Sequence, residues 1–408
     1  MTASSLEISL PPRRITILGS TGSIGCSTVD LVGRQPEVFA VDTLTAFSNV
    51  SLLAKQAREL GAKLVVIGDE NRFKELKDAL SGSSVEVAAG RNALIEAAMR
   101  PSDFVMAAIV GAAGLEPTLA AVCRGATVGL ANKECLVCAG DLMKAEMEKS
   151  GATLLPVDSE HSAIYQVFDF DRREAVESII LTASGGPFRT YTQAQMENVT
   201  PEQAVAHPNW DMGAKISVDS ATMMNKGLEI IEAYHLFGIE SEKIQILVHP
   251  QSVIHSCVTY VDGSVLSQMG VPDMRTPIAY SLAWPRRMAT PVERLDLASI
   301  AKLTFEAPDF KRFPSLSMAY QALKSGGSAP TILNAANEVA VAAFLDGKIG
   351  FLDIVRVVEK ALERMPSKPM ATLAHVHEID TMTRDMASDW IVDFARTGGA
   401  SSGIAVSR

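Results

Sequence analysis

Short apolar runs alternate with amphipathic segments from Arg14 to about Pro156. Runs of this length are typical of buried strands, and the segments between them have the spacing of helices that cover a sheet. Strands that alternate with helices imply crossover connections, which build a parallel sheet. We therefore predict a doubly wound α/β domain over residues 1–157, with strands at Ile15–Leu18, Val41–Ala46, Leu64–Ile67, Phe104–Val110, Thr127–Ala131 and Thr153–Val157 and helices that include Ile24–Arg34, Val50–Leu60 and Arg91–Met99.

Beyond residue 157 the apolar spacing changes twice. Residues 158–284 mix both periods and predict a central α+β domain, with strands at Val176–Ala183, Lys243–His249, Ser252–Val261 and Val265–Gly270 and one long helix at Ser220–Phe237. A polar loop at 185–213 is long enough to be a lid. Prolines mark 285–312 as a connector, and the helical spacing of 313–408 predicts a C-terminal helical bundle, with helices at Leu316–Lys324, Thr331–Asp346, Leu352–Met365 and Ile379–Thr397.

Charge and cysteine content narrow the class of protein. A net charge of −10 offers nothing to a polyanion, so nucleic acid is not an expected partner. The five cysteines are an odd number without a disulfide framework, and Cys135 and Cys138 lack the second pair that a zinc site needs. The sequence contains neither a signal-peptide run nor an apolar stretch that could span a bilayer. We expect a cytoplasmic protein without membrane association.

The first predicted strand ends in Gly19-Ser20-Thr21-Gly22-Ser23-Ile24-Gly25, directly before a helix. Glycines let a backbone turn sharply and approach a pyrophosphate, to which the helix N-terminus offers free N–H groups. A glycine pattern alone is a weak signal, because many strand–helix turns contain glycine. This one follows the first strand and opens a helix, which is the context that dinucleotide-binding domains require. We therefore predict a Rossmann-like cofactor site.

The end of the second strand bears on the choice of cofactor. NAD sites usually place an acid there to hold the ribose 2′-hydroxyl. This chain has Phe47-Ser48-Asn49 instead, and Asp42 comes too early. An uncharged end with hydroxyl and amide groups can accept a 2′-phosphate, which favours NADPH. Ser48 and Asn49 could also simply cap the next helix, or do both.

Two carboxylates follow the strand that ends at Val157. Ligands bind beyond the carboxyl ends of parallel strands, so Asp158 and Glu160 are expected to face the cleft of the sheet. Hard oxygen ligands of this kind suit Mg²⁺ or Mn²⁺. A third ligand is needed to hold the ion, and on this motif alone a helix-capping role for Asp158 is an equal alternative.

The segment Lys215–Glu229 collects polar groups at the start of an apolar helix. Ser220, Asn225 and Lys226 supply a hydroxyl, an amide and an ammonium within two turns, which are the donors that a phosphate needs. Asn225 and Glu229 are four residues apart and share a helix face. One helix could thus hold a phosphate and lend a carboxylate to a metal. The alternative is an exposed polar face with a Lys226–Glu229 pair.

Three further positions carry groups that suit a reaction site. Lys133 follows a strand and could polarise a substrate oxygen or donate a proton, although a surface lysine is an equal alternative. Ser184 and the two glycines after it offer a hydroxyl and backbone amides to an anion. In the predicted lid, His207 could bond to polar groups and Trp210 could exclude water. Alternatively, Trp210 packs in the core and His207 caps a turn.

At Asn132–Glu134, Asp158–Glu160, Ser184–Phe188, His207–Gly213 and Lys215–Glu229 the chain closely resembles the 1-deoxy-D-xylulose 5-phosphate reductoisomerase family. The resemblance extends over essentially the whole chain. The family rearranges a phosphorylated ketose and reduces the resulting aldehyde with NADPH to 2-C-methyl-D-erythritol 4-phosphate, in non-mevalonate isoprenoid biosynthesis. The resemblance implies that the central domain is catalytic, that Asp158, Glu160 and Glu229 bind Mg²⁺ or Mn²⁺, and that the protein is a homodimer.

The resemblance also implies residue roles. Catalysis would involve the three metal ligands with Lys133 and His207, and the substrate would contact Lys133, Ser159, Glu160, Ser184, His207, Trp210, Ser220, Asn225, Lys226 and Glu229. NADPH would contact Thr21, Gly22, Ser23, Ile24, Phe47, Ser48, Asn49, Asn132, Glu134 and Gly213. The family often has a Gly-Lys-Asn-like end to the second strand, where this chain has Phe47-Ser48-Asn49. Arg58 could replace the missing lysine at the 2′-phosphate.

Two other functions fit parts of the sequence. A short-chain-type sugar phosphate dehydrogenase or epimerase also opens with a glycine turn but needs a Tyr-x-x-x-Lys pair in the nucleotide domain. Tyr320 and Lys324 have that spacing and fall in the helical C-terminal region instead. A non-catalytic NADPH sensor would keep the glycine turn and have no need of the carboxylates.

Overall fold

The computed structural model describes residues 11–210 and 212–396. These form two compact units. Unit 1 takes its residues from Met1–Asn132, Ala145–Ser159 and Asp273–Val292, and unit 2 from Lys133–Lys144, Glu160–Pro272 and Glu293–Arg408. The four-part division that the sequence suggests stays a prediction.

Unit 1 contains a seven-stranded sheet in the order β4-β3-β2-β1-β5-β6-β7, and every neighbouring pair is parallel. The strands are β1 Arg13–Leu18, β2 Phe39–Ala46, β3 Leu64–Ile67, β4 Glu86–Ala89, β5 Phe104–Ala107, β6 Thr127–Leu130 and β7 Thr153–Pro156. The side chains of β3 and β5 are buried throughout, as expected of strands covered on both faces. The predicted doubly wound parallel sheet is confirmed.

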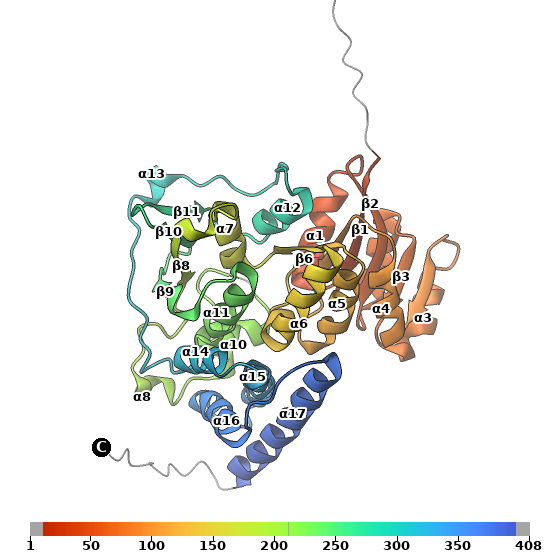
Figure 1. Ribbon diagram of the computed structural model, residues 1–408. Helices are drawn as coiled ribbons and strands as arrows, with labels where there is room; N and C mark the ends of the chain where they lie inside the picture. Colours follow the sequence, from red (N-terminus) through yellow and green to blue (C-terminus); the bar gives the residue numbers. More distant parts are fainter. Residues whose placement is uncertain (1–10, 211, 397–408) are drawn as a thin grey trace, which may run out of the picture. The chain divides into compact units, whose positions relative to one another are not determined.

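The strand order reverses between β1 and β5, which is where such sheets bind ligands. Helices α1 and α2 pack on β1–β3, while α4 and α5 return the chain to β5 and β6, and α12 covers β6 and β7 (Figure 1). The helices of this unit are α1 Ser23–Gly33, α2 Val50–Leu60, α3 Phe73–Ala79, α4 Arg91–Met99, α5 Leu115–Cys123 and α12 Arg275–Ala283. Helix α6, Glu134–Ser150, is kinked at Ala139 and divides between the two units.

Unit 2 contains a four-stranded mixed sheet in the order β11-β10-β8-β9. Its strands are β8 Val176–Ala183, β9 Ile244–Val248, β10 Ile254–Tyr260 and β11 Val265–Met269. Strand β8 pairs in parallel with β9, and the pairs β8–β10 and β10–β11 are antiparallel. Helix α7, Ser159–Val167, leads into this unit. The predicted α+β character of the central region is confirmed.

The single helix predicted at Ser220–Phe237 is wrong at its start. The segment forms two helices, α10 Ala214–Ala221 and α11 Met224–Phe237. They separate at Met223, which has a φ of 61° in the left-handed region that a residue with a Cβ seldom adopts. Ser220 therefore belongs to α10, while Asn225 and Glu229 belong to α11.

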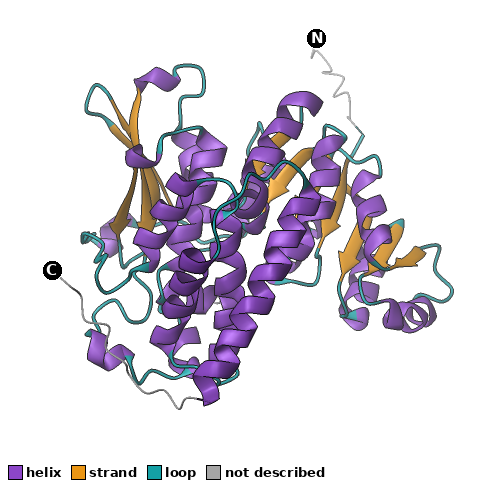
Figure 2. Ribbon diagram, turned by 60° about the horizontal axis from the view of Figure 1, so that its bottom comes forward, coloured by secondary structure: helices purple, strands orange, loops and turns teal. Residues whose placement is uncertain are grey.

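The long polar loop at 185–213 is partly helical. It contains α8 Gln193–Met196 and α9 Pro201–Val205, each begun by a threonine capping box. The predicted connector contains only a short helix, α13 Leu297–Ile300, among the elements described there. After it, α14 Ser315–Ser325, α15 Ala329–Leu345, α16 Phe351–Arg364 and α17 Leu373–Arg396 form the predicted bundle, in which α15 contacts each of the other three. Figure 1 labels these four helices, and Figure 2 distinguishes helices in purple from strands in orange. Among the helices of residues 11–210 and 212–396, none combines the length and apolar character needed to cross a bilayer.

Candidate active site

The glycine turn of unit 1 has the geometry of an anion-binding loop. Gly19 has a φ of 83°, and a Cβ there would lie 2.6 Å from the carbonyl oxygen of Ala108. A Cβ on Gly25 would lie 2.2 Å from the carbonyl oxygen of Gly19. Gly22 caps α1 without a side-chain hydrogen bond, and both Gly22 and Ser23 are exposed. The first turn of α1 is therefore open to a ligand, as a pyrophosphate site requires.

The end of the second strand is exposed at Phe47, Ser48 and Asn49. Asn49 caps α2, because its side chain accepts a hydrogen bond from the amide of Leu52. Asp42 is excluded as a ribose ligand, since it is buried and bound to Arg100 at 2.8 Å. Arg58 donates from its Nη2 atom to the carbonyl oxygens of Ala79 and Ser81, at 2.7 and 3.3 Å, so these contacts engage one of its three guanidinium nitrogens.

Asn132, Asp158 and Ser159 belong to unit 1 and follow β6 and β7. The Asn132 amide donates to the carbonyl oxygens of Ile109 and Gly111, and so ties the end of β6 to the loop after β5. Asp158 directly precedes α7, and Glu160 lies in the first turn of that helix. Carboxylates at this position are favoured by the positive end of the helix dipole.

In unit 2, Glu229 is fully buried and accepts from three donors. Asn225 donates to its Oε1 at 2.6 Å, the Lys133 ammonium lies 3.4 Å from the same oxygen, and Lys226 donates to Oε2. Lys226, itself 3% exposed, also lies 2.8 Å from Oε1 of Glu160. One ammonium thus bridges two carboxylates. Glu160 and Glu229 are thus brought to the same ammonium, and Asn225 also contacts Glu229.

This arrangement fits a divalent cation. Glu160 and Glu229 share the Lys226 ammonium, and two carboxylates this close to one cation would repel each other without it. Glu160 and Glu229 supply carboxylate oxygens, which are ligands of the kind that suits Mg²⁺ and Mn²⁺. The Oδ1 atom of Asn225 is buried and has no hydrogen-bond partner among the described residues. Such an atom is usually satisfied by a ligand or water.

A second group of predicted residues gathers at the end of β8. The Nε2 atom of His207 lies 2.9 Å from the Ser184 hydroxyl, which also accepts from the Gly186 amide at 3.1 Å. Gly186 lies against the end of α10, where a Cβ would be 2.6 Å from the carbonyl oxygen of Ser220. Three segments therefore meet here: the end of β8 with Ser184, the loop with His207 and the end of α10 with Ser220. Trp210 is half-buried, with its ring 6.2 Å from that of His255.

Substituting Gly186 by alanine is expected to raise the KM for the phosphorylated substrate by about tenfold or more, because the new Cβ must push the loop away from Ser220. Gly186 also has a φ of 66°, which costs alanine about 1 kcal/mol. Gly61→Ala is the matched control, since Gly61 has a φ of 61° with nothing within 4 Å of its Cβ position. Steady-state kinetics of both variants measure the effect. A KM of Gly186→Ala equal to that of Gly61→Ala would contradict the prediction.

The hydrogen bonds of His207 fix its tautomer. Its Nδ1 atom accepts from the backbone amides of Asn209 and Trp210, at 3.2 and 3.0 Å, so the proton of the neutral ring is on Nε2 and points to Ser184. Burial lowers the pKa of His207 below its usual value, against an opposing effect of Glu160. The neutral ring is thus the form that anchors residues 207–210.

The anchoring by His207 is expected to be constant above about pH 6.5 and to be lost as the pH falls through its lowered pKa. Protonated Nδ1 cannot accept the two amides, so their hydrogen exchange, corrected for its intrinsic pH dependence, should accelerate about tenfold. Hydrogen–deuterium exchange of peptides covering 205–210 measures this. His207→Gln should remove the pH dependence, and an unchanged dependence in that variant would contradict the assignment.

Some residues near this site were missed by the sequence analysis. Glu232, one turn after Glu229, lies 3.7 Å from Lys133, and the ring of His161 lies 3.0 Å from the backbone carbonyl of Glu229. Lys215 joins Glu134 to Asp219. For the Lys215 contacts, the only sequence signal was that Lys215 and Asp219 are four residues apart on a helix.

Three family models of 1-deoxy-D-xylulose 5-phosphate reductoisomerase match the chain. The reductoisomerase model matches residues 15–140, its C-terminal domain model residues 154–237, and the further model of a DXP reductoisomerase C-terminal domain residues 269–386. The chain is 61% identical over 379 residues to the reductoisomerase of Rhodospirillum centenum, covering 93% of this chain and 94% of that one. It is 59% identical over 377 residues to that of Zymomonas mobilis, covering 92% and 97%.

Solved structures agree with these matches. The Zymomonas mobilis reductoisomerase in complex with NADPH superposes with a TM-score of 0.89 at 56% identity, covering 94% of this chain and 99% of that one. A reductoisomerase in complex with NADPH, fosmidomycin and magnesium gives a TM-score of 0.91 at 42% identity, covering 95% and 100%. The chain therefore belongs to the 1-deoxy-D-xylulose 5-phosphate reductoisomerase family.

Proposed function

We propose that the chain converts 1-deoxy-D-xylulose 5-phosphate into 2-C-methyl-D-erythritol 4-phosphate with NADPH and one divalent metal ion. It is an NADP-dependent oxidoreductase that also isomerises the carbon skeleton, and it serves isoprenoid biosynthesis. The observation that carries this conclusion is the Lys226 ammonium shared by the buried Glu229 and the partly exposed Glu160, within a chain 61% identical to a reductoisomerase. The solved relatives that hold NADPH and magnesium support both cofactors.

Asp158, Glu160 and Glu229 are the proposed metal ligands. The metal would supply positive charge to two neighbouring substrate oxygens, and NADPH the reducing equivalent. Because Lys226 contacts both Glu160 and Glu229, a cation on these carboxylates would take over their neutralisation. Lys226 and Asn225 would then be released to the substrate phosphate. Metal binding would in this way prepare the phosphate site.

The remaining roles follow from the position of each group. The Lys133 ammonium, beside Glu229, would donate to the substrate oxygens. The Ser184 oxygen accepts hydrogen bonds from Gly186 and His207, so its own hydroxyl proton can be donated to a phosphate. Ser159 and Ser220 are the further hydroxyl groups that would contact the substrate. Trp210 would exclude water. The glycine turn, the residues after β2, Asn132, Glu134 and Gly213 would contact NADPH.

The short-chain-type alternative is not supported. The Tyr320 hydroxyl donates to the carbonyl oxygen of Ile244, and burial raises the pKa of Tyr320 to about 12. A tyrosine that must exchange a proton during catalysis needs a lowered pKa. Tyr320 and Lys324 also belong to unit 2, whereas the glycine turn belongs to unit 1.

One assay tests the proposed function. The protein is supplied with 1-deoxy-D-xylulose 5-phosphate, Mg²⁺ or Mn²⁺ and NADPH, and the absorbance of the reduced nicotinamide is followed. Turnover that EDTA abolishes and excess Mg²⁺ restores is the expected result. Turnover that survives EDTA would favour a metal-independent dehydrogenase, and NADPH binding without turnover would favour a sensor.

A cytoplasmic homodimer belongs to the same proposal. All five cysteines are free, as a reducing compartment favours. Strand β11 stands at the edge of its sheet and exposes Val265 and Leu266 by 54% and 49%. An exposed apolar edge strand is a natural surface for pairing with a second chain. Sedimentation equilibrium should give the mass of a dimer, and a monomer at micromolar concentration would count against it.

A further inference from the structure

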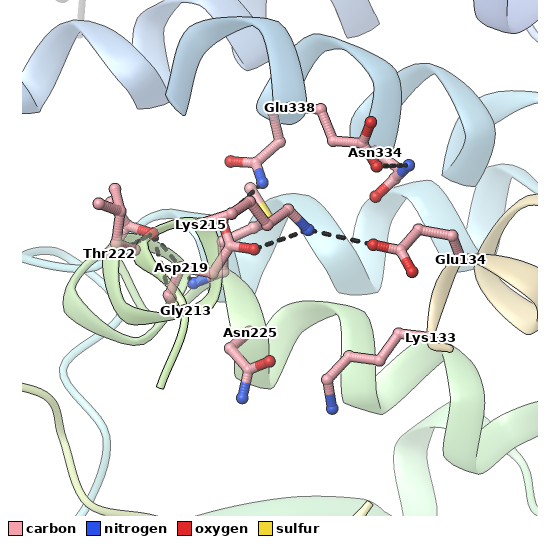
Figure 3. A network of polar contacts seen from close by, with 12 residues as sticks. Lys133, Glu134, Gly213, Lys215, Asp219, Thr222, Asn225, Asn334 and Glu338 are labelled. Carbon is pink, nitrogen blue, oxygen red and sulfur yellow. Dashed lines mark hydrogen bonds and ion pairs between the residues drawn. The ribbon is translucent and has the colours of Figure 1, made fainter. Parts of the chain in front are cut away.

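Lys215 is a partly exposed cation held between carboxylates of two helices, with 28% of its side chain exposed. Its ammonium lies 2.9 Å from Asp219 on its own helix α10 and 3.3 Å from Glu134 at the start of α6 (Figure 3). Asp219 is 1% exposed and Glu134 is 5% exposed. Burial opposes the charge of Lys215, but Asp219, Glu134 and Glu338 outweigh it and raise the pKa of Lys215 above its usual value. The ammonium is therefore charged at any working pH.

The C-terminal bundle holds the Asp219 carboxylate from its other side. Asn337 of α15 donates to Oδ1 of Asp219 at 2.7 Å. Glu338, the next residue of α15, accepts from Asn334 at 3.1 Å and from Arg384 of α17 at 2.6 Å. Asp219 thus accepts from Asn337 and pairs with Lys215, and these two contacts restrain its carboxylate.

On its other side Lys215 meets Glu134, the residue after Lys133. The Lys133 ammonium lies 3.4 Å from the carboxylate of Glu229. A line of contacts therefore runs from Asn337 through Asp219 and Lys215 to Glu134, which begins α6 beside the proposed catalytic lysine. A buried carboxylate without a cation would be costly, and it would turn away or take up a proton.

We propose that Lys215, clamped by Asp219 and Asn337, is a positioning residue that orients and neutralises Glu134 for the bound nicotinamide cofactor. The inference rests on the proposed function, which assigns Glu134 to NADPH. NADPH is an anion, so a Glu134 carboxylate paired with Lys215 would repel it less than an unpaired carboxylate would. The C-terminal bundle would in this way determine cofactor affinity through a residue that does not itself touch the cofactor.

A double-mutant cycle on cofactor binding tests this role. The dissociation constant of NADPH is measured from its fluorescence for the wild-type protein, Lys215→Met, Glu134→Gln and the double variant. Lys215→Met should weaken binding about tenfold or more, but no more than about twofold in the Glu134→Gln background, because there is then no charge to neutralise. Lys215→Arg, which keeps the charge, should come within about threefold of the wild type. Effects that add across the cycle would show a merely structural lysine and overturn the inference.

Should Lys215→Met fail to fold, Asn337→Ala carries the same test. It releases Asp219 without removing a charge and should weaken NADPH binding about threefold, again only when Glu134 is present. A wild-type protein that neither binds NADPH nor turns over the substrate would contradict the proposed function. A wild-type protein that does both, with a Lys215 or Asn337 variant that binds NADPH equally tightly, would contradict this inference alone.

Discussion

Glu229→Gln is expected to lower kcat by about 10³-fold or more while NADPH binding stays within about twofold of the wild type. The glutamine keeps the shape of a fully buried side chain and loses the charge that faces Lys133, Lys226 and the proposed metal. The glycine turn, which belongs to unit 1, is unaffected. Steady-state kinetics and a fluorescence titration of NADPH measure the two effects.

Glu232→Gln is the matched control for this variant. Glu232 is 3% exposed on the same helix and lies 3.7 Å from Lys133, so its substitution also removes a buried negative charge beside that lysine. We expect a loss of kcat of no more than about tenfold, because Glu232 is not a proposed metal ligand. If kcat fell equally in the two variants, the loss would come from the removal of a buried negative charge beside Lys133 and not from a lost metal ligand. Full activity of Glu229→Gln would refute the metal assignment.

Lys226→Met is expected to weaken substrate binding and to strengthen metal binding. The KM for the phosphorylated substrate should rise by about 30-fold or more, since an ammonium that binds the phosphate is lost. The apparent affinity for Mg²⁺ should rise, because Lys226 no longer competes for Glu160 and Glu229. The metal-free variant should unfold at a lower temperature, because the buried Glu229 and the partly exposed Glu160 lose the ammonium that they share.

Thermal unfolding with and without Mg²⁺ measures this competition. Added Mg²⁺ should raise the unfolding temperature of Lys226→Met more than that of the wild type, because an ion stabilises the folded state according to its affinity. Lys243→Met is the control, since Lys243 is half-exposed and its ion pair with Glu240 is 3.7 Å long. A weaker response to Mg²⁺ in Lys226→Met would show that Lys226 supports the metal and does not compete with it.

Much of the fold followed from local sequence signals. Helix α2 has the predicted bounds, Val50–Leu60, because Asn49 caps its start and Gly61 ends it with a φ of 61°. Strand β8 has the predicted bounds, Val176–Ala183, since its residues are mostly buried and apolar. The predicted phosphate donors lie at the end of β8 and on either side of the break before α11. Lys226 bridges Glu160 and Glu229, and these two carboxylates belong to elements far apart in sequence.

What the sequence did not predict has physical causes. The short strand β4, Glu86–Ala89, stands at the edge of the sheet and has no apolar run to mark it. The break at Met223 has no glycine or proline, so the residue types favour an unbroken helix. The contact of Asn337 with Asp219 joins positions 118 residues apart, and only the packing of α10 on α15 brings them together.

We propose that Asp158, Glu160 and Glu229 hold one cation. A Mn²⁺ binding isotherm followed by electron paramagnetic resonance tests this metal site most directly. The wild-type protein should bind one ion per chain, and Asp158→Asn, Glu160→Gln and Glu229→Gln should each weaken that binding by about tenfold or more. An isotherm that any one of the three substitutions leaves unchanged would contradict the claim.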